Sequence, residues 1–204
     1  MAKGKLIVLE GADGTGKSTH ARLLSEHLLA RGYNTVITEE PTKGEIGGFI
    51  RKILSGSKKV SPETLALLFT ADRAEHIENV IKPAIDSGKI VITDRYYYST
   101  IAYQSVQGLS QKWLSEINSF AVDPDIVIVL EIESQEALNR MNRETKEVFE
   151  YLDFQKKVQK ALLGMANGGN KALSRPGKAW AVISTSAPRE EVQKKIASFV
   201  DSKL

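Results

Sequence analysis

Residues 11 to 18 have the types and spacing needed to bind the phosphates of a nucleotide. They read Gly-Ala-Asp-Gly-Thr-Gly-Lys-Ser and match G-x-x-x-x-G-K-[ST] at every specified position. Glycines let successive backbone N–H groups face a β-phosphate. Lys17 is expected to neutralise β- and γ-phosphate oxygens of ATP, and the Ser18 hydroxyl to bind Mg²⁺. The predicted ATP contacts are Gly11, Ala12, Asp13, Gly14, Thr15, Gly16, Lys17, Ser18 and Thr19.

This loop predicts nucleotide binding but not the reaction, because GTPases, ATPases and kinases share it. A second pair of residues narrows the choice. Asp94 and Arg95 directly follow the apolar run 89–93. An Asp at the end of a buried strand beside such a loop is expected to hold Mg²⁺. The planar guanidinium of Arg95 suits an acceptor phosphate, although a structural Asp–Arg pair remains an alternative.

Phe69 and Arg73 are four residues apart in a predicted helix, 62–87, and therefore share one face. An aromatic ring with an arginine one turn later can stack on a base and donate hydrogen bonds to its carbonyl edge. Beside Leu65 and Leu68, however, an aromatic ring at this spacing is more often part of the core. The spacing alone leaves both interpretations open.

The elements that must position these residues alternate between short β-branched runs and longer amphipathic stretches. This alternation predicts one three-layer α/β domain over residues 1–204, with a parallel sheet covered by helices on both faces. Ligands bind beyond the carboxyl ends of such strands, where both chemical motifs fall. Pro83 is expected to end or kink its helix. The predicted strands are 5–10, 34–38, 89–93, 125–131 and 180–184, and the predicted helices are 17–31, 44–55, 62–87, 109–121, 134–143, 149–165 and 189–202.

Composition excludes several other functions. The chain has 204 residues, of which 42% are hydrophobic, and its formal net charge is only +3. So small an excess of basic residues does not favour binding to nucleic-acid polymers or to membrane surfaces. The chain contains no cysteine, so it has no disulfide or thiol nucleophile. A signal-peptide core and a membrane-spanning run are both lacking in the sequence, and a cytoplasmic location is expected.

Five segments together resemble the thymidylate kinase family of P-loop nucleoside monophosphate kinases along nearly the whole chain. They are 10–18, 40–42, 67–73, 94–104 (Asp-Arg-Tyr-Tyr-Tyr-Ser-Thr-Ile-Ala-Tyr-Gln) and 123–125. The resemblance implies the P-loop nucleotide-kinase fold with a parallel five-stranded sheet. It also implies transfer of the γ-phosphate of ATP to dTMP with Mg²⁺, and a homodimer. Two alternatives stay open, namely a kinase for another nucleoside monophosphate or nucleoside, and a weakly active nucleotide-binding paralogue.

The resemblance also implies roles for individual residues of the acceptor site. Phe69 would stack on thymine, Arg73 would bind its exocyclic oxygen, and Arg95 would hold the acceptor phosphate. Asp13 would contact the 3′-hydroxyl or orient Arg95. The remaining implied contacts are Thr100 and Gln104 in the base pocket and Tyr103 against the sugar, where a ribose 2′-hydroxyl would clash.

A mobile lid normally closes over the phosphates and excludes water. Residues 140–150 fit this task, and Arg143, then Arg140, is the expected catalytic arginine, because position 14 is Gly where some family members carry it. An ordinary solvated turn is the alternative. The chain also departs from the family at Glu39, where an arginine often grips the acceptor. Arg51 is expected to serve instead, with Lys43 as a further candidate.

Overall fold

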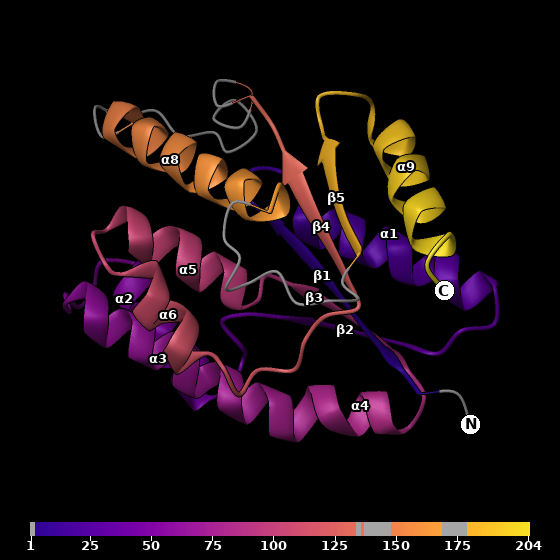
Figure 1. The fold of residues 1–204 in the computed structure, drawn as a ribbon, viewed down its shortest axis with the longest axis horizontal. Helices are drawn as coiled ribbons and strands as arrows, with labels where there is room; N and C mark the ends of the chain where they lie inside the picture. Colours follow the sequence, from indigo (N-terminus) through magenta and orange to yellow (C-terminus); the bar gives the residue numbers. More distant parts are fainter. Residues whose placement is uncertain (1–2, 134–135, 137–147, 169–178) are drawn as a thin grey trace.

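The computed structural model describes residues 3–133, 136, 148–168 and 179–204. Its centre is a sheet of five parallel strands in the order β2-β3-β1-β4-β5 (Figure 1). The register places Leu9 beside Asp94 and Gly11 beside Leu130, so the ends of β1, β3 and β4 lie together. The strands are β1 (Lys5–Gly11), β2 (Thr35–Glu39), β3 (Ile90–Asp94), β4 (Ile126–Glu131) and β5 (Ala179–Ser184).

Helices cover both faces of this sheet, as predicted. On one face α1 (Lys17–Ala30) and α9 (Arg189–Asp201) pack against Ile7 and Leu9. On the other face Leu6 and Val8 contact the remaining helices of the core. These are α3 (Pro62–His76), η1 (Ile77–Ile81), α4 (Lys82–Asp86), α5 (Tyr97–Val106), α6 (Gln111–Ile117) and α8 (Val148–Ala166), while α2 (Glu45–Leu54) packs on α3.

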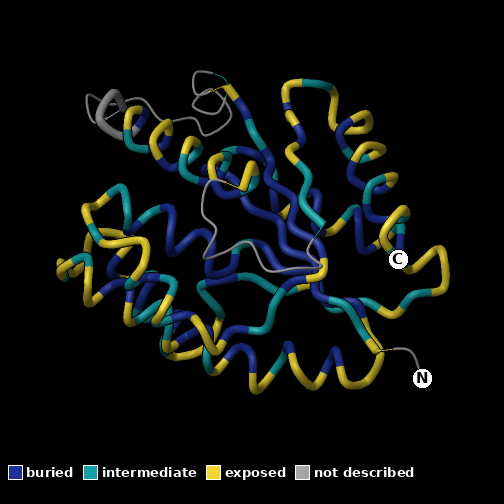
Figure 2. The backbone as a smooth tube through the Cα atoms, viewed as in Figure 1, coloured by how far each residue is buried: buried dark blue, intermediate teal, exposed yellow. Residues whose placement is uncertain are grey.

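Burial confirms the interpretation of the apolar runs as central strands. Every residue of β3, and the first five of β4, is buried (Figure 2). The outer surfaces of the helices carry most of the exposed positions in the same view. Strands covered on both faces need apolar side chains pointing both ways, which explains the continuous rather than alternating pattern.

Helix starts follow ordinary capping chemistry. Ser61 accepts a hydrogen bond from the Thr64 N–H at 3.2 Å, and Pro62 occupies the first helical position of α3, where its missing N–H costs nothing. The predicted effect of Pro83 takes a specific form. A single π-helical turn, η1, precedes it, and the helix continues through Pro83 to Asp86.

Two differences from the sequence prediction concern helices. The segment after β3 forms α5, a ten-residue helix that the sequence did not predict. Its aromatic and β-branched residues have modest helix propensity, and tertiary packing decides its structure instead. The predicted helix 134–143 lies outside the described residues, apart from position 136. Among the described helices, none is both long and apolar enough to cross a membrane.

Candidate active site

The glycine-rich loop after β1 encloses a cavity of about 320 Å³. Gly11 has a φ of +153°, and a Cβ there would lie 2.5 Å from the Leu130 carbonyl oxygen of β4, so a larger residue does not fit. Gly16, with a φ of +81°, precedes the first turn of α1. The loop therefore faces the cavity with the amino end of a helix, which favours an anion. The lining residues are Asp13, Gly14, Gly16, Lys17, Ser18, Thr19, Asp94 and Arg95.

Lys17 lies buried at the base of this cavity and its ammonium donates to the Ala12 carbonyl at 2.9 Å. Burial and, to a smaller extent, the charge of Arg95 lower the pKa of Lys17 to about 8, although Asp94 and Asp13 act in the opposite direction. The carboxylates near Lys17 therefore do not fully compensate its positive charge. Phosphate oxygens would supply that charge.

Ser18 and Asp94 form the part of this cavity suited to a cation. The Ser18 hydroxyl, in the first turn of α1, donates to Asp94 Oδ2. The register of β3 beside β1 places Asp94 next to Leu9, just before the phosphate loop. Asp94 Oδ1 is buried without a hydrogen-bond partner among the described residues. A hydroxyl oxygen beside an unsatisfied carboxylate oxygen matches the oxygen ligands that Mg²⁺ prefers. The residues present therefore fit a magnesium ion, and their predicted role as its ligands stays a prediction.

Arg95 stands between the two halves of the site. Its backbone has a φ of +69°, the only positive φ of a non-glycine residue in the described chain. Its Nη1 donates to the Gly11 carbonyl at 3.1 Å and to Ser99 Oγ at 3.0 Å, and its Nη2 donates to Asp13. These bonds use three of its five N–H groups. Arg95 also has a side-chain hydrogen bond with Tyr103. The N–H groups of Nε and Nη2 that the three bonds above do not use are the ones suited to an oxyanion.

A second cavity, of about 490 Å³, adjoins the first at Asp13 and Arg95. It has the size of a small-molecule site and a largely apolar wall. The lining includes six of the predicted acceptor contacts besides Asp13, which are Phe69, Arg73, Arg95, Thr100, Tyr103 and Gln104, and it adds Glu40, Pro41, Leu54, Leu65, Tyr96, Ser99, Gln107, Phe154 and Gln155. The structure thus gathers residues that lie far apart in the sequence around one space.

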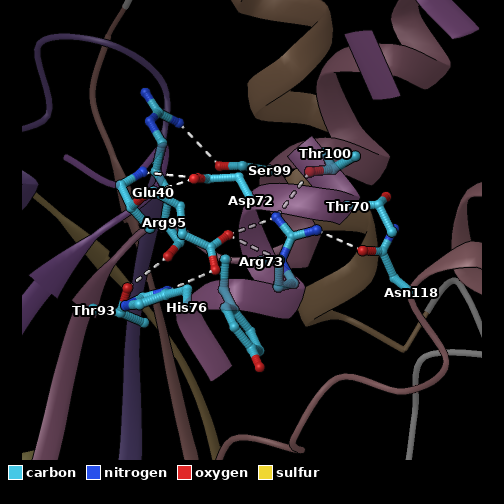
Figure 3. A network of polar contacts seen from close by, with 12 residues as sticks. Glu40, Thr70, Asp72, Arg73, His76, Thr93, Arg95, Ser99, Thr100 and Asn118 are labelled. Carbon is cyan, nitrogen blue, oxygen red and sulfur yellow. Dashed lines mark hydrogen bonds and ion pairs between the residues drawn. The ribbon is translucent and has the colours of Figure 1, made fainter. Parts of the chain in front are cut away.

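Arg73 is held by a network of buried polar side chains in the wall of this cavity (Figure 3). Its Nε and Nη2 donate to one oxygen of Glu40, at 2.9 and 2.6 Å. Nη2 also donates to Thr100 Oγ1 at 3.0 Å, and Nη1 to Asn118 Oδ1 at 2.5 Å. Within the described chain four of the five N–H groups are therefore occupied. One N–H of Nη1 is left for a ligand.

Gln104 offers the complementary group. Its Nε2 donates to Gln107 Oε1 at 3.3 Å, and its Oε1 is buried without a partner in the part of the chain that the structure describes. A buried unsatisfied acceptor is costly, so a ligand donor would be bound strongly there. Gln104 and Thr100 share one face of α5, because they are four residues apart.

Phe69 contacts both the core and the acceptor cavity, so its predicted stacking on a base stays a prediction. The ring packs on the small cluster of Ile50, Ile53 and Leu65, and it is only half-buried there. Its other side lines the acceptor cavity. A ring supported from behind by a fixed cluster can stack on a base with little loss of side-chain freedom.

Tyr103 closes the cavity near its junction with the phosphate loop. Its hydroxyl lies 3.4 Å from Asp13 Oδ1 and 3.3 Å from Gln155 Oε1. The Arg95 guanidinium lies 5.1 Å from the centre of its ring, and the Phe154 ring packs edge-on at 5.9 Å. Burial raises the pKa of Tyr103. The hydroxyl is therefore neutral, and it can meet a sugar hydroxyl as donor or acceptor.

Comparisons with known proteins agree with this geometry. The sequence model of the thymidylate kinase family matches residues 9–196. The chain belongs to the thymidylate kinase family. Relatives described as "Probable thymidylate kinase" include one from Thermococcus onnurineus, 41% identical over 97% of this chain and 98% of the relative. Another, from Methanococcus maripaludis, is 42% identical over 98% and 96%, and one from Thermococcus kodakarensis is 48% identical over 78% and 83%.

The departures from the thymidylate kinase pattern lie at the end of β2. Arg51 of α2 donates to the carbonyls of Pro41 and Thr42, and it lies 3.3 Å from the Glu39 carboxylate. Lys43 is 3.9 Å from the same carboxylate. Arg51 therefore holds the segment after β2 and is not among the residues that line either cavity. Its predicted contact with the acceptor stays a prediction.

Both lid arginines, Arg140 and Arg143, lie outside the described residues, so their predicted role stays a prediction. Sequence reasoning missed other residues of this thymidylate kinase site. Glu40 was noted only as part of a motif, although it pairs with Arg73. Glu10, Ser99 and Gln155 were missed because their bonds cross long stretches of chain, for which spacing gives no signal. Glu10 and Ser99 are 89 residues apart, and Gln155 is 142 residues from Asp13 and 52 from Tyr103.

Proposed function

We propose that this member of the thymidylate kinase family transfers the γ-phosphate of ATP to dTMP, giving dTDP and ADP. One observation carries the proposal. A single free N–H of Arg73 and a single free buried oxygen of Gln104, both counted over the described residues, line the same cavity. That cavity ends at Arg95, whose Nε and Nη2 are not held by Gly11 or Ser99.

This pair of groups favours thymine over cytosine. Thymine has an acceptor oxygen at position 4 and a donor N–H at position 3, which complement the Arg73 N–H and Gln104 Oε1. Cytosine presents an amino group and an unprotonated ring nitrogen there, so it would place donor against donor and acceptor against acceptor. A site with fixed buried partners rejects such a ligand strongly, because its own groups are left unpaired.

Phosphoryl transfer needs positioning and charge neutralisation more than covalent participation by the protein. Arg95 would hold the acceptor phosphate, oriented by Asp13, while Lys17 binds the β- and γ-phosphates. Ser18 and Asp94 would hold Mg²⁺, which when bound neutralises phosphate charge. The acceptor phosphate is already an anionic nucleophile near neutral pH, so the reaction requires no general base.

Further elements of the proposal rest on the sequence. They are a single kinase domain over residues 1–204, a lid at 140–150 that supplies Arg143 or Arg140, acceptor binding by Arg51, a cytoplasmic location and a homodimer.

The test is ADP release in a coupled assay with ATP and Mg²⁺, with dTMP, dUMP, dCMP, dGMP, UMP and thymidine offered separately. We expect turnover with dTMP, weaker turnover with dUMP, and none with dCMP or thymidine. A Gln104→Leu variant should raise the KM for dTMP and narrow the gap between dTMP and dCMP. Faster turnover with dCMP than with dTMP in the unmodified protein would refute the base assignment.

A further inference from the structure

Glu10 is a fully buried carboxylate at the end of β1, one residue before the phosphate loop. It lines neither of the two cavities. One of its oxygens accepts hydrogen bonds from the backbone N–H groups of Tyr96 (2.9 Å) and Ser99 (3.1 Å), and the other accepts from the Ser99 hydroxyl at 2.6 Å. All three of these hydrogen bonds of the Glu10 carboxylate therefore go to the start of α5.

That first turn needs an external partner. The first N–H groups of a helix lack the usual acceptor four residues earlier, and Tyr96, the residue that precedes α5, makes no side-chain cap. The Ser99 N–H shares its proton between the Tyr96 carbonyl, at 3.0 Å, and Glu10. Glu10, at the end of β1, caps this helix instead, and its negative charge lies at the positive end of the helix. The cap also fixes the chain on the carboxyl side of Arg95, whose backbone occupies the unfavourable left-handed region.

Ser99 transmits this arrangement to the guanidinium. Its hydroxyl donates its only proton to Glu10, so the lone pairs of the oxygen face Arg95 Nη1, which donates to it at 3.0 Å (Figure 3). The Gly11 carbonyl takes the other proton of Nη1 at 3.1 Å. With Nη1 fixed on one side, Nε and Nη2 are directed to the opposite side, where the two cavities join.

We propose that Glu10 is a positioning residue for the acceptor phosphate, acting through Ser99 on Arg95. The inference rests on the proposed function only in naming dTMP as the acceptor. Glu10 contacts no substrate. It sets the direction of one hydroxyl and the backbone of one strained residue, and these together orient Nε and Nη2 of Arg95.

Electrostatics supports the same conclusion. The charged groups that face Glu10 are Arg95 and Lys17, yet neither forms an ion pair with it in the described structure, and burial outweighs both, raising the pKa of Glu10 to about 7. A carboxyl group whose charged form is destabilised by burial contributes little to the free energy of folding at neutral pH. Burying the charged form of Glu10 lowers the stability of the fold, while its hydrogen bonds reach residues next to Arg95. These two facts fit a functional role better than a structural one.

The test compares Glu10→Gln, Ser99→Ala and the double variant with the unmodified protein. Glutamine keeps the size of the side chain and the acceptor for the backbone N–H groups. Its amide, however, donates to the Ser99 oxygen, so the Ser99 hydroxyl proton turns toward Arg95. We expect each single variant to raise the KM for dTMP by about 10-fold, as for one charge-assisted hydrogen bond. The KM for ATP should change less than 2-fold. The double variant should resemble the worse single one, since both interrupt the same chain.

Ser105→Ala is the matched control. Ser105 is on the same helix, and its hydroxyl bonds only to the Ala102 carbonyl, at 3.0 Å, among the described residues. It should leave both KM values unchanged. An unchanged KM for dTMP in Glu10→Gln, equal increases for dTMP and ATP, or multiplicative effects in the double variant would each overturn the proposal.

The two proposals fail separately. The substrate panel on the unmodified protein tests the reaction, and the variants test the positioning. If another monophosphate proves to be the acceptor, the same variants are measured with that substrate, and the split between its KM and that of ATP still decides the role of Glu10. Urea unfolding of Glu10→Gln at pH 8 should show no loss of stability, which excludes misfolding as the cause of a weaker KM.

Discussion

Replacing Glu40 by glutamine should destabilise the protein far more than an ordinary loss of an ion pair. The Glu40 and Arg73 side chains are 3% and 1% exposed, and two N–H groups of the arginine converge on one carboxylate oxygen at 2.9 and 2.6 Å. The other oxygen lies 3.0 Å from His76 Nδ1. Removing the negative charge leaves the arginine buried without its counter-ion. Solvent cannot replace the lost partner at so low an exposure.

The expected loss is about 3–5 kcal/mol in the free energy of unfolding, the usual range when one partner of a buried pair is removed. This is a large part of the stability of a typical domain. Glu26→Gln is the matched control, because Glu26 pairs with Arg22 at 2.7 Å through side chains that are 56% and 59% exposed. An exposed pair of this kind contributes less than about 0.5 kcal/mol.

The assay is guanidinium unfolding of both variants, with the free energy extrapolated to water. Steady-state kinetics on the folded fraction of Glu40→Gln should also show a higher KM for dTMP, because Arg73 no longer holds its remaining N–H toward the base. A loss below 1 kcal/mol, or one equal to that of Glu26→Gln, would refute the claim that Glu40 compensates the buried charge. A stability loss without a change in KM would refute its link to the base.

Three further perturbations follow from the site. Lys17→Ala should lower kcat by at least ~100-fold with ADP release as the measurement, and near-normal turnover would contradict its contact with the transferring phosphate. Phe69→Ala should raise the KM for dTMP by about 1–3 kcal/mol of lost stacking, and an unchanged KM would assign Phe69 to the core alone. Burial raises the pKa of Glu10 from 4.5 to about 7, so the folded protein keeps a proton that the unfolded chain releases in this window. Stability should therefore fall by at most about 3 kcal/mol as the pH rises from 4.5 to 7, a slope that urea titrations should find absent in Glu10→Gln.

Much of the fold could be predicted because the local sequence patterns agree with the burial that the tertiary structure imposes. Each strand falls within one residue of its predicted bounds, since apolar runs covered on both faces have few other structures open to them. The glycine-rich loop was equally clear, because its chemistry depends on residues adjacent in the sequence. Helix α5 was not predicted. Its first turn is capped by Glu10, a residue more than 80 positions earlier, and a local window cannot contain that information.

The sequence could predict which residues form the acceptor site, but not which hydrogen-bond partners each of them has. The sequence placed Arg73 near a base, yet which of its N–H groups remain free depends on Glu40, Thr100 and Asn118, from three other segments. The same limit applies to Arg51. Its charge suggested a phosphate ligand, while in the structure its guanidinium binds two backbone carbonyls and Glu39.

The order of the strands has a consequence for synthesis on the ribosome. β1 emerges first, but its neighbours in the sheet are β3 and β4, and β2, which follows it in the chain, pairs only with β3 in the described sheet. The Leu6–Leu9 segment, fully buried at the end, must wait for about 80 further residues before β3 exists. At about 5–20 residues per second this interval is about 4–16 s. During that time the future phosphate loop follows an unpaired apolar strand, which is a natural target for chaperones on the nascent chain.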